Sequence, residues 1–504
     1  MFKNKNNQSP AENQTLAEIV KRAEKSFDFK ELKKNISGIQ IFILYFTSLI
    51  DQKTMERVLL PYINEYEKNK DQTLDIYQFI NNLPLEDVIK TIDTKDIEEK
   101  IHQGYALIKF ENISKDCLLV NVSNLSKGIR ETNETENEFN VIGPKVGFVE
   151  SLDTNIHLLR SKLKSPLLTT EEIVLGTLSK TRVAIVYLDG ITNEKHIETV
   201  KKRLSEIDFD IIWDTSALIQ LIKENSHTPF PLYFSSERLD RISYTITSGQ
   251  VVIFSDGSPY AISGPTTIFD FFLSSEDYYY NWIIGSFFRI TRILAIIFSI
   301  FSTSIYVAVV TFHYEVIPAD LLGPLIESRA NVPFPPLLEV LFLEMTIELL
   351  REAGARLPTK VGQTLGIVGG IVIGQAAVAA ALTSNILLII VALSALASFT
   401  TPTTVMSNTI RILRFPFILM SSILGGLGIV IGLAALLCHL FKLKSFDTPY
   451  MVPLYPFRLN NLTDSFIRPP YNKLNKRPDY LRPIDKLKYS PKERNKKKDD
   501  INDE

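Results

Sequence analysis

The sequence ITRILAIIFSIFSTSIYVAVVTF, residues 290–312, carries a single charge, near its start. A helix of this length can cross the hydrocarbon core of a bilayer, which is about 30 Å thick. Three later stretches, residues 361–382, 385–406 and 415–441, lack internal charge. Because backbone amides must be hydrogen-bonded inside a bilayer, all four stretches are predicted to be α-helices of a membrane domain, residues 281–444.

Glycine recurs at every fourth position of the second stretch, at Gly362, Gly366, Gly370 and Gly374. These residues share one helix face, where the bare backbone lets another helix approach closely. Packing within one subunit and packing between subunits account for this pattern equally well. The stretch also contains GIVGGIVIG, but no strand precedes it in its apolar surroundings, so a dinucleotide-binding loop is rejected.

Residues 335–352, PPLLEVLFLEMTIELLRE, are predicted to form a helix of a different kind. Two prolines suit a helix N-terminus, and Glu344, Glu348 and Glu352 follow at intervals of four on one face. Such a helix is expected at the membrane interface, as a re-entrant element, or lining a watery cavity. In the last case its acidic side chains would select cations.

The alternative for residues 335–352 is a surface helix, in which Glu348 pairs with Arg351 and Glu352 pairs with Arg356. Exposed pairs of this kind contribute little to stability.

Pro402 stands among four threonines and is predicted to break or kink its helix, with hydroxyl groups satisfying the freed carbonyls. A static kink and a hinge or gate both fit this sequence. The candidate pore or gating residues are therefore Glu344, Glu348, Arg351 and Pro402.

Charges around the apolar stretches predict the orientation of the chain. Arg289 and Arg292 accompany the start of the first stretch, whereas residues 313–332 hold one arginine and three acidic residues. The positive-inside rule then places residues 1–280 in the cytoplasm. Four spans return the tail to the same side, whereas a fifth crossing by residues 335–352 would place it outside. Four spans are favoured.

Two features bear on this topology. With four spans, Arg411 and Arg414 lie on the side of the membrane away from the cytoplasm, which counts against that prediction. The tail, residues 445–504, is rich in lysine, arginine and proline. It is predicted to pack on the soluble region or to contact anionic lipid.

Residues 1–280 mix charged and apolar residues as soluble proteins do. Residues 1–30 are predicted to be a disordered arm. Two related α/β subdomains, residues 31–140 and 141–280, are predicted because both run strand, helix and then glycine, strand, turn and strand. Gly104 begins the last part of the first repeat (GYALIKFENISKDCLLV), and Gly249 begins that of the second (GQVVIFSDGSPYAI).

Hydrophobic patterns predict the elements of these subdomains. In the first, strands are predicted over residues 39–50, 105–110 and 117–122, and helices over residues 53–67 and 85–101. In the second, strands are predicted over residues 183–188, 209–213, 249–254 and 260–262, and a helix over residues 194–207.

Enzyme motifs are not found in the sequence. Cys117 and Cys438 lie far apart, so they predict neither a disulfide framework nor a cysteine-rich metal site. The six histidines lack ligand spacing, and no P-loop or nucleophile elbow occurs. We therefore expect no catalytic activity, cofactor, metal or nucleic-acid partner.

Residues 327–380 (ESRANVPFPPLLEVLFLEMTIELLREAGARLPTKVGQTLGIVGGIVIGQAAVAA) closely resemble the GerA family, the A subunits of bacterial spore germinant receptors. So do residues 142–168, 183–193, 255–282 and 411–429. The resemblance covers about residues 140–470. The sequence departs from the family at Ser384-Asn385, where Ser-Pro is expected, and in the acidic stretch ETNETENEFN before Gly143.

The resemblance implies a role in spore germination in response to small nutrients such as amino acids, sugars or nucleosides. It implies a subunit of the spore inner membrane that works with a permease-like B subunit and a lipoprotein C subunit. The family resemblance also implies that this subunit forms a homo-oligomer and conducts or gates ions. The alternatives are a non-conducting scaffold that joins the other subunits and a secondary transporter, although the spans show no internal repeat.

Overall fold

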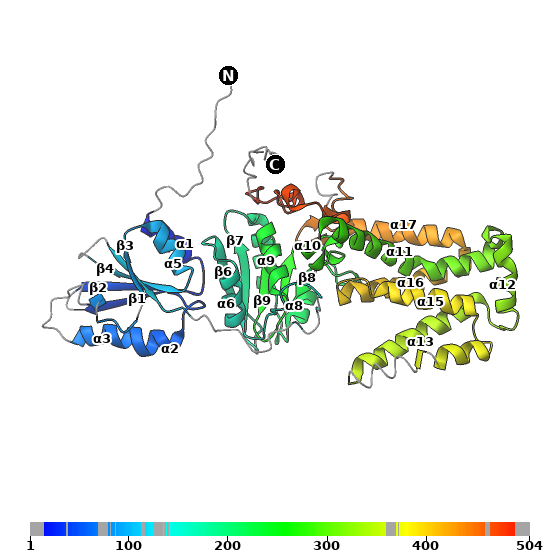
Figure 1. The fold of residues 1–504 in the computed structure, drawn as a ribbon, viewed down its shortest axis with the longest axis horizontal. Helices are drawn as coiled ribbons and strands as arrows, with labels where there is room; N and C mark the ends of the chain where they lie inside the picture. The colour runs from blue at the N-terminus through cyan, green and yellow to red at the C-terminus, as the bar shows by residue number, and fades with distance from the viewer. Residues whose placement is uncertain are drawn as a thin grey trace, which may run out of the picture. The chain divides into compact units, whose positions relative to one another are not determined.

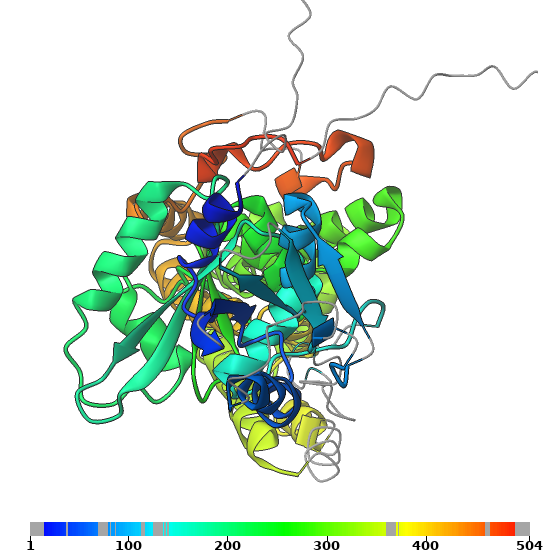
Figure 2. The same cartoon turned by 90° about the vertical axis from the view of Figure 1, so that its left-hand side faces the viewer.

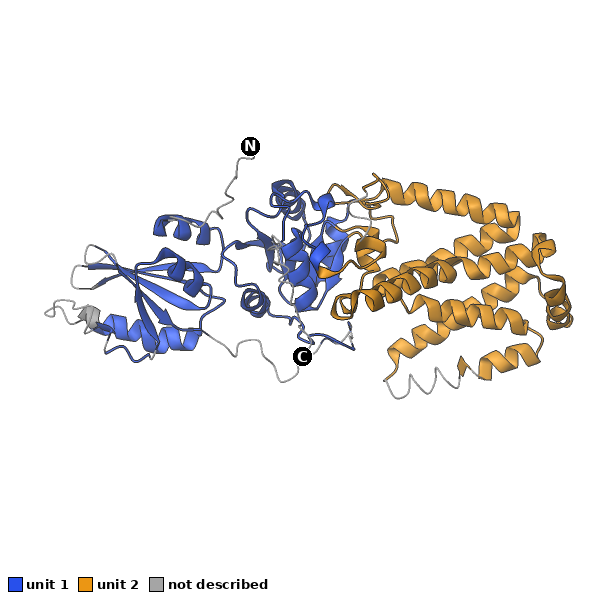
Figure 3. Cartoon of the chain, turned by 45° about the horizontal axis from the view of Figure 1, so that its top comes forward, with its two compact units in different colours: residues 1–224, 233–265, 472–504 blue, residues 225–232, 266–471 orange. Residues whose placement is uncertain are grey.

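The chain forms two compact units (Figures 1 and 3). The sheet unit comprises residues 1–224, 233–265 and 472–504, and the helical unit comprises residues 225–232 and 266–471. The structure, a computed structural model, describes residues 15–36, 39–68, 79–80, 82–85, 87–111, 116–123, 135, 138, 141–358, 369–370, 372–458 and 464–488.

The first subdomain of the sheet unit contains a five-stranded antiparallel sheet in the order β1-β2-β4-β5-β3. Its strands are β1 (Phe29–Ile36), β2 (Ile39–Phe46), β3 (Val88–Thr91), β4 (Tyr105–Phe110) and β5 (Cys117–Asn121). One face is covered by α2 (Gln52–Thr54), the π-helical turn η1 (Met55–Leu59) and α3 (Leu60–Lys68) (Figures 1 and 2). The other is covered by α1 (Leu16–Ala23) and α5 (Thr94–Ile101). Apolar side chains on both faces of β2 and β4 thus lie between two helical layers.

The second subdomain contains a five-stranded antiparallel sheet in the order β6-β7-β9-β10-β8. Its strands are β6 (Leu168–Leu175), β7 (Thr181–Leu188), β8 (Phe234–Ser236), β9 (Val251–Ser255) and β10 (Ala261–Gly264). Helices α6 (Leu152–Lys162) and α9 (Leu239–Ser248) pack on one face of β7 and β9. The subdomain also holds α7 (Glu194–Ser205) and α8 (Thr215–Ile222). The strand order is that of the first sheet, which agrees with two related subdomains.

The repeated glycine has a conformational reason. Gly104 directly precedes β4, and Gln250 alone separates Gly249 from β9; the φ angles of the two glycines are +94° and +102°. Both stand where the chain leaves a helix and reverses into a strand, a left-handed conformation that favours glycine. The sequence repeat therefore marks the same turn in both subdomains.

Substituting these glycines is expected to have unequal effects. Gly249→Ala should cost about 1–2 kcal/mol, the usual penalty of the left-handed region, because the nearest atom to its Cβ is 3.6 Å away. Gly104→Ala should cost more, because its Cβ would lie 2.7 Å from Ser123 Cβ and 2.9 Å from the Leu49 carbonyl oxygen. Amide hydrogen exchange of β4 and β9 in the full chain measures both losses. Equal losses of protection would contradict the role given to the Ser123 contact.

A buried ion pair joins the two subdomains of the sheet unit. Asp28, just before β1, accepts two hydrogen bonds of 2.7 Å from Arg160 on α6, and both side chains are 2% exposed. Thr170 of β6 donates to the same carboxylate, and the Arg160 guanidinium lies 4.4 Å from the centre of the Phe46 ring. Burial raises the pKa of Asp28, but the Arg160 charge and the hydrogen bonds outweigh it and hold the pKa below its usual value.

Several predicted elements of the sheet unit differ in the structure. Residues 209–213 are not a strand, because their carbonyls accept hydrogen bonds from a turn at residues 177–179 while Phe209 and Trp213 are exposed. Residues 85–101 divide into β3 and α5, since Asp93 caps a new helix by accepting a hydrogen bond from the Lys95 amide.

The boundaries of the sheet unit also differ from those predicted. The predicted disordered arm, residues 1–30, contains α1, which begins with a capping box and buries Ile19 and Ala23. The predicted second subdomain ends at residue 265 rather than 280, because residues 266–280 belong to the helical unit.

After residues 225–232, the helical unit continues with short elements at residues 266–280 and then with a bundle (Figure 3). The short elements are η2 (Ile268–Phe271) and α10 (Glu276–Tyr279). The helices of the bundle are α11 (Trp282–Phe312), α12 (Ala319–Arg329), α13 (Pro336–Arg356), α15 (Asn385–Ser398), α16 (Thr404–Leu424) and α17 (Gly426–Lys442). Smaller elements are η3 (Tyr314–Val316), the two-stranded ribbon β11 (Lys444–Ser445) and β12 (Thr448–Pro449), and, in the tail, η4 (Tyr471–Lys473) and η5 (Asp479–Leu481). Within the described residues, α11 has the length and the apolar composition needed to cross a membrane, and α15 and α17 are shorter apolar helices.

Two of the predicted spans are wrong as continuous helices. The predicted span 385–406 ends at Ser398, since the Thr-Pro segment before Thr404 leaves the helical path. The predicted span 415–441 is divided at Gly425, where φ is +58°. Instead, α16 runs through residues 404–424 and carries Arg411 and Arg414 inside the bundle rather than in an outside loop.

The predicted glycine-rich span is described in part. Gly362 and Gly366 lie outside the described residues, whereas residues 369–370 and 372–379 are helical. A Cβ on Gly374 would lie 3.7 Å from a methyl group of Leu388 on α15, so this glycine faces a neighbour within the chain. A Cβ on Gly370 would have no such neighbour among the described atoms within 4 Å.

The predicted tail divides between the two units. Residues 445–471 belong to the helical unit, where Arg468 donates to the Tyr280 carbonyl oxygen at 2.7 Å. Residues 472–488 pack in the sheet unit, where the Ile484 amide donates to the Ile191 carbonyl oxygen at 2.9 Å.

Candidate functional site

Arg414 of α16 lies inside the helical unit and connects four helices. Its Nη1 is 3.1 Å from Glu344 Oε2 of α13, and both side chains are almost fully buried. Its Nη2 donates to Ser299 Oγ of α11 at 2.6 Å and to the Ser394 carbonyl oxygen of α15 at 2.9 Å. One guanidinium therefore holds α11, α13, α15 and α16 together by hydrogen bonds that are shielded from solvent.

Glu348 forms a second, less buried connection between α13 and α16. One of its carboxylate oxygens lies 2.8 Å from Arg351 of the same helix and 3.8 Å from Arg411 of α16. The Arg411 side chain is almost buried and also donates through Nε to the Ser407 carbonyl oxygen at 3.3 Å. Glu348 thus sits between two cations, one on each helix.

A third acidic residue of α13 is paired at the other end of the helix. Arg329 of α12 lies 2.8 Å from Glu339, whose side chain is fully buried. The pairs of Glu339, Glu344 and Glu348 with arginines of α12 and α16 are called the charge ladder below.

Helix α13 carries apolar residues on both sides, and Val340 and Leu343 are buried in the core of the bundle. Its carboxylates in the charge ladder point into the bundle, whereas four large apolar side chains on its other side are exposed: Leu338, Phe342, Met345 and Leu349. A helix in a soluble protein turns its apolar side inward. Ionisable residues of membrane helices face the interior of the bundle and pair with one another, so this arrangement suits apolar surroundings.

The structure describes the four candidate pore or gating residues. Glu344 and Glu348 belong to the charge ladder, and Arg351 pairs with Glu348 on the same helix. Pro402 lies in the segment between α15 and α16, not within a helix. The ion pairs of the surface-helix alternative also exist, with Glu352 2.5 Å from Arg356 on an exposed surface. The two interpretations of residues 335–352 therefore describe different turns of one helix.

The sequence analysis did not identify the arginines of α16 that pair with the acidic residues of the charge ladder. Arg411 and Arg414 were expected outside the membrane, between the spans predicted at residues 385–406 and 415–441. Their spacing of three places both on one helix face, just as the spacing of four does for Glu344 and Glu348. Matching these two charge patterns is the signal that could have paired α13 with α16.

The arginines that predicted the orientation are also paired. Arg292 Nη1 lies 3.0 Å from Asp277 Oδ2, and the fully buried Arg289 lies 3.4 Å from the same carboxylate. Part of the positive charge at the start of α11 is thus neutralised within the helical unit. The cytoplasmic placement of residues 1–280 stays a prediction.

Comparisons with known proteins agree on the family. The model of the family described as Bacillus/Clostridium GerA spore germination protein matches residues 14–480. The chain is 47% identical over 484 residues to spore germination protein GerQA of Bacillus cereus, with 96% of each chain covered. It is 43% identical over 470 residues to spore germination protein GerIA of the same organism, covering 93% of this chain and 69% of that one.

Part of the chain is similar to a solved structure, the crystal structure of the N-terminal domain of the A subunit of the Bacillus megaterium spore germinant receptor GerK3. The likeness has a TM-score of 0.38 and 25% identity, and it covers 50% of this chain and 92% of that one. On the family match and the two Bacillus cereus relatives, the chain belongs to the GerA family of spore germination proteins.

Proposed function

We propose that this chain is the A subunit of a nutrient germinant receptor that triggers spore germination. The names of its relatives and the family match support this role. In this proposal it lies in the spore inner membrane as a multi-pass protein whose N-terminal sheet unit faces the cytoplasm. Its partners are a permease-like B subunit, a lipoprotein C subunit and further copies of itself.

The observation that carries the mechanism is the burial of Arg414 among four helices. In a low-dielectric bundle, separating Glu344 from Arg414 costs far more than it does in water. Glu348 is less buried, and its two cations lie on different helices, so it can keep Arg351 while α13 moves away from Arg411. The charge ladder thus acts as a latch between α13 and α16 that a partner subunit releases when nutrient binds.

Release of the latch would let water reach the acidic side of α13. Hydrated carboxylates attract cations, so an open state would conduct or gate cations past Glu348 and Glu344. In this proposal nutrient sensing shifts an equilibrium between the latched and open states, as a ligand does when it binds one state more tightly.

A second candidate function is a scaffold that assembles the receptor without conducting. It is favoured by the pairing of Glu339, Glu344 and Glu348, because each acidic group of the ladder already has a cation within the chain. In this case the ladder holds the bundle in one shape, and the ion path belongs to another subunit.

Glu348→Gln separates these two functions. The variant removes the charge that holds Arg411 but keeps the size of the side chain, so the latch should open more easily. Ion release is measured from spores or loaded liposomes that carry this chain and its partner subunits, with and without nutrient. The expected result is a changed rate of nutrient-triggered release.

Glu352→Gln is the matched control, because Glu352 is one turn away and pairs with Arg356 on an exposed surface. It should release ions at the rate of the unaltered chain. Equal rates in all three proteins would remove the ladder from the gate. Assembly with the partners and equal nutrient-triggered release in all three proteins would favour the scaffold, in which the ion path belongs to another subunit.

A further inference from the structure

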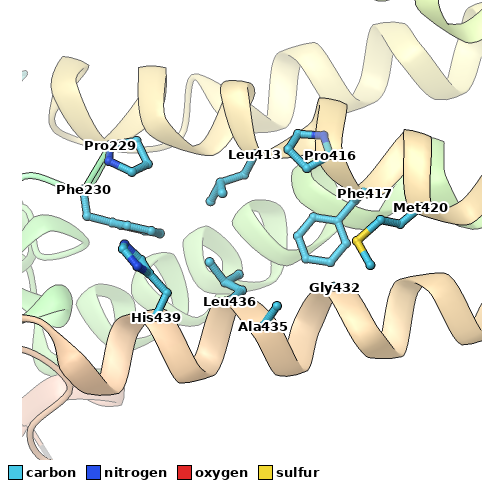
Figure 4. Close-up of a pocket in the computed structure, with 10 residues that line it drawn as sticks. All are labelled: Pro229, Phe230, Leu413, Pro416, Phe417, Met420, Gly432, Ala435, Leu436 and His439. Carbon is cyan, nitrogen blue, oxygen red and sulfur yellow. The ribbon is translucent and has the colours of Figure 1, made fainter. Parts of the chain in front are cut away.

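An apolar trough runs between α16 and α17 in the helical unit (Figure 4). Its volume is about 320 Å³, within the range of small-ligand pockets. The walls are formed by Leu413, Phe417 and Met420 of α16 and by Ala435 and Leu436 of α17, and Phe230 lies at one end. The lining residues follow one another along the two helices (Figure 4).

Small residues of α17 border this space. Gly432 of α17 faces Phe417, whose ring would lie 2.8 Å from a Cβ at that position. The missing side chain therefore lets the ring sit against the backbone. One turn further along α17, Ala435 presents a single methyl group to the trough.

The polar chemistry of the trough is limited to His439. His439 Nε2 is 2.9 Å from Thr228 Oγ1, within hydrogen-bond distance, and its ring centre lies 6.1 Å from that of Phe230. An amino acid in the trough would leave its ammonium or carboxylate group without a partner of opposite charge, which is costly in apolar surroundings. A hydrocarbon chain needs no such partner.

The end of the trough at His439 is close to a basic segment. Residues 439–458 contain Lys442, Lys444 and Arg458 against one acidic residue, Asp447. Lys442 follows His439 by three positions on the same side of α17, and both lysine side chains are exposed. Lys442 also lies in the last turn of α17, where it offsets the negative end of the helix dipole.

Aromatic side chains accompany these lysines. The rings of Phe441 and Tyr455 are 5.1 Å apart, and both residues are more than one-third exposed. Exposed aromatic residues beside lysine at the end of an apolar helix are typical of the boundary between hydrocarbon and headgroups. Lysines at that depth attract the anionic headgroups of phospholipids.

We propose that the trough binds one acyl chain of an anionic phospholipid from the surrounding bilayer, with its phosphate at Lys442 and Lys444. The inference rests on the proposed placement of the helical unit in a membrane. A lipid held between α16 and α17 would couple the packing of α16, which carries Arg411 and Arg414, to the composition of the membrane.

The test uses the full chain in nanodiscs of phosphatidylcholine that contain a small fraction of phosphatidylglycerol with a photoreactive acyl chain. Labelled peptides are identified by mass spectrometry. Ala435→Phe fills the trough and should remove most of the labelling of the wall peptides from α16 and α17. Ala434→Phe, next to it on α17 but not lining the trough, should leave the labelling unchanged.

The headgroup is tested by Lys442→Gln with Lys444→Gln. Labelling by the phosphatidylglycerol probe should fall by about fivefold for each lysine, the usual effect of one basic residue near an anionic surface. A phosphatidylcholine probe with the same photoreactive chain should label this variant and the unaltered chain alike.

The exposed side of α15, with Ile389 and Leu393, reports insertion independently of the trough. Labelling of α15 without preferential labelling of the trough would overturn the lipid site and leave the membrane placement intact. Equal labelling in the Ala434 and Ala435 variants would also overturn it, as would crosslinks from another copy of the chain in place of lipid. No labelling of α15 at all would overturn the membrane placement and the lipid site together.

Discussion

Arg414→Met is expected to lower the free energy of unfolding of the helical unit by about 3–5 kcal/mol, because it leaves the buried carboxylate of Glu344 without its cation. The penalty arises from the unpaired charge rather than from the loss of an attractive contact. Arg414 also bonds to Ser299 and to the Ser394 carbonyl, so α11 and α15 lose part of their connection to α16. Titration of the purified chain in micelles with a denaturing detergent measures the loss.

Two variants separate this explanation from a general loss of packing. Arg414→Met combined with Glu344→Leu removes both charges and should recover most of the stability, since apolar residues of similar volume often replace a buried pair without loss. Arg356→Met breaks an exposed pair and should cost no more than about 1 kcal/mol. Similar losses in the two single variants, or no recovery in the double variant, would contradict the importance of the buried charge.

The elements that are best predicted from the sequence are those with an uninterrupted apolar pattern. The observed bounds of β4, β5 and α7 lie close to the predicted ones. The apolar side chains of these elements pack into the core of their own subdomain, so the pattern within each element is enough to predict it. β1 (FKELKKNI) and β6 (LTTEEIVL) were missed, although each pairs along its whole length with the following strand. Both are edge strands, rich in polar and charged residues, and only the neighbouring strand gives them their structure.

The bundle shows a different limit of sequence reasoning. A count of charges assumes that an arginine ends a span, yet Arg414 lies inside α16 because Glu344, 70 residues earlier, neutralises it. The periodicity of α13 identified Glu344 and Glu348 as candidates, but periodicity within one helix carries no information about which other helix it meets. The helix packing that brings α13 to α16 supplies that part of the site.

Asp28→Asn is expected to destabilise the association of the two subdomains of the sheet unit by about 3–5 kcal/mol, because the charge of Arg160 is left buried and unpaired. Asn keeps the size of the side chain, but its NH2 group cannot accept a hydrogen bond, so the loss combines the missing charge with a lost acceptor for Arg160. Asp189→Asn is the matched control, since Asp189 pairs with Lys25 at 2.5 Å on an exposed surface and should cost at most about 1 kcal/mol. Native-state hydrogen exchange of β1 and β6 in the full chain measures both changes.

Acidification provides an independent test of the same pair. The pKa of Asp28 is lower in the folded chain than its usual value of 3.8, so unfolded chains bind a proton at this residue more readily. The stabilisation by the pair is therefore complete above about pH 4 and is lost as the pH falls through the folded pKa. The difference in protection between the unaltered chain and Asp28→Asn should shrink over that acid range, while the small difference for Asp189→Asn stays small at every pH. A difference for Asp28→Asn that persisted in strong acid would mean that the shape of the site, and not its charge, joins the subdomains.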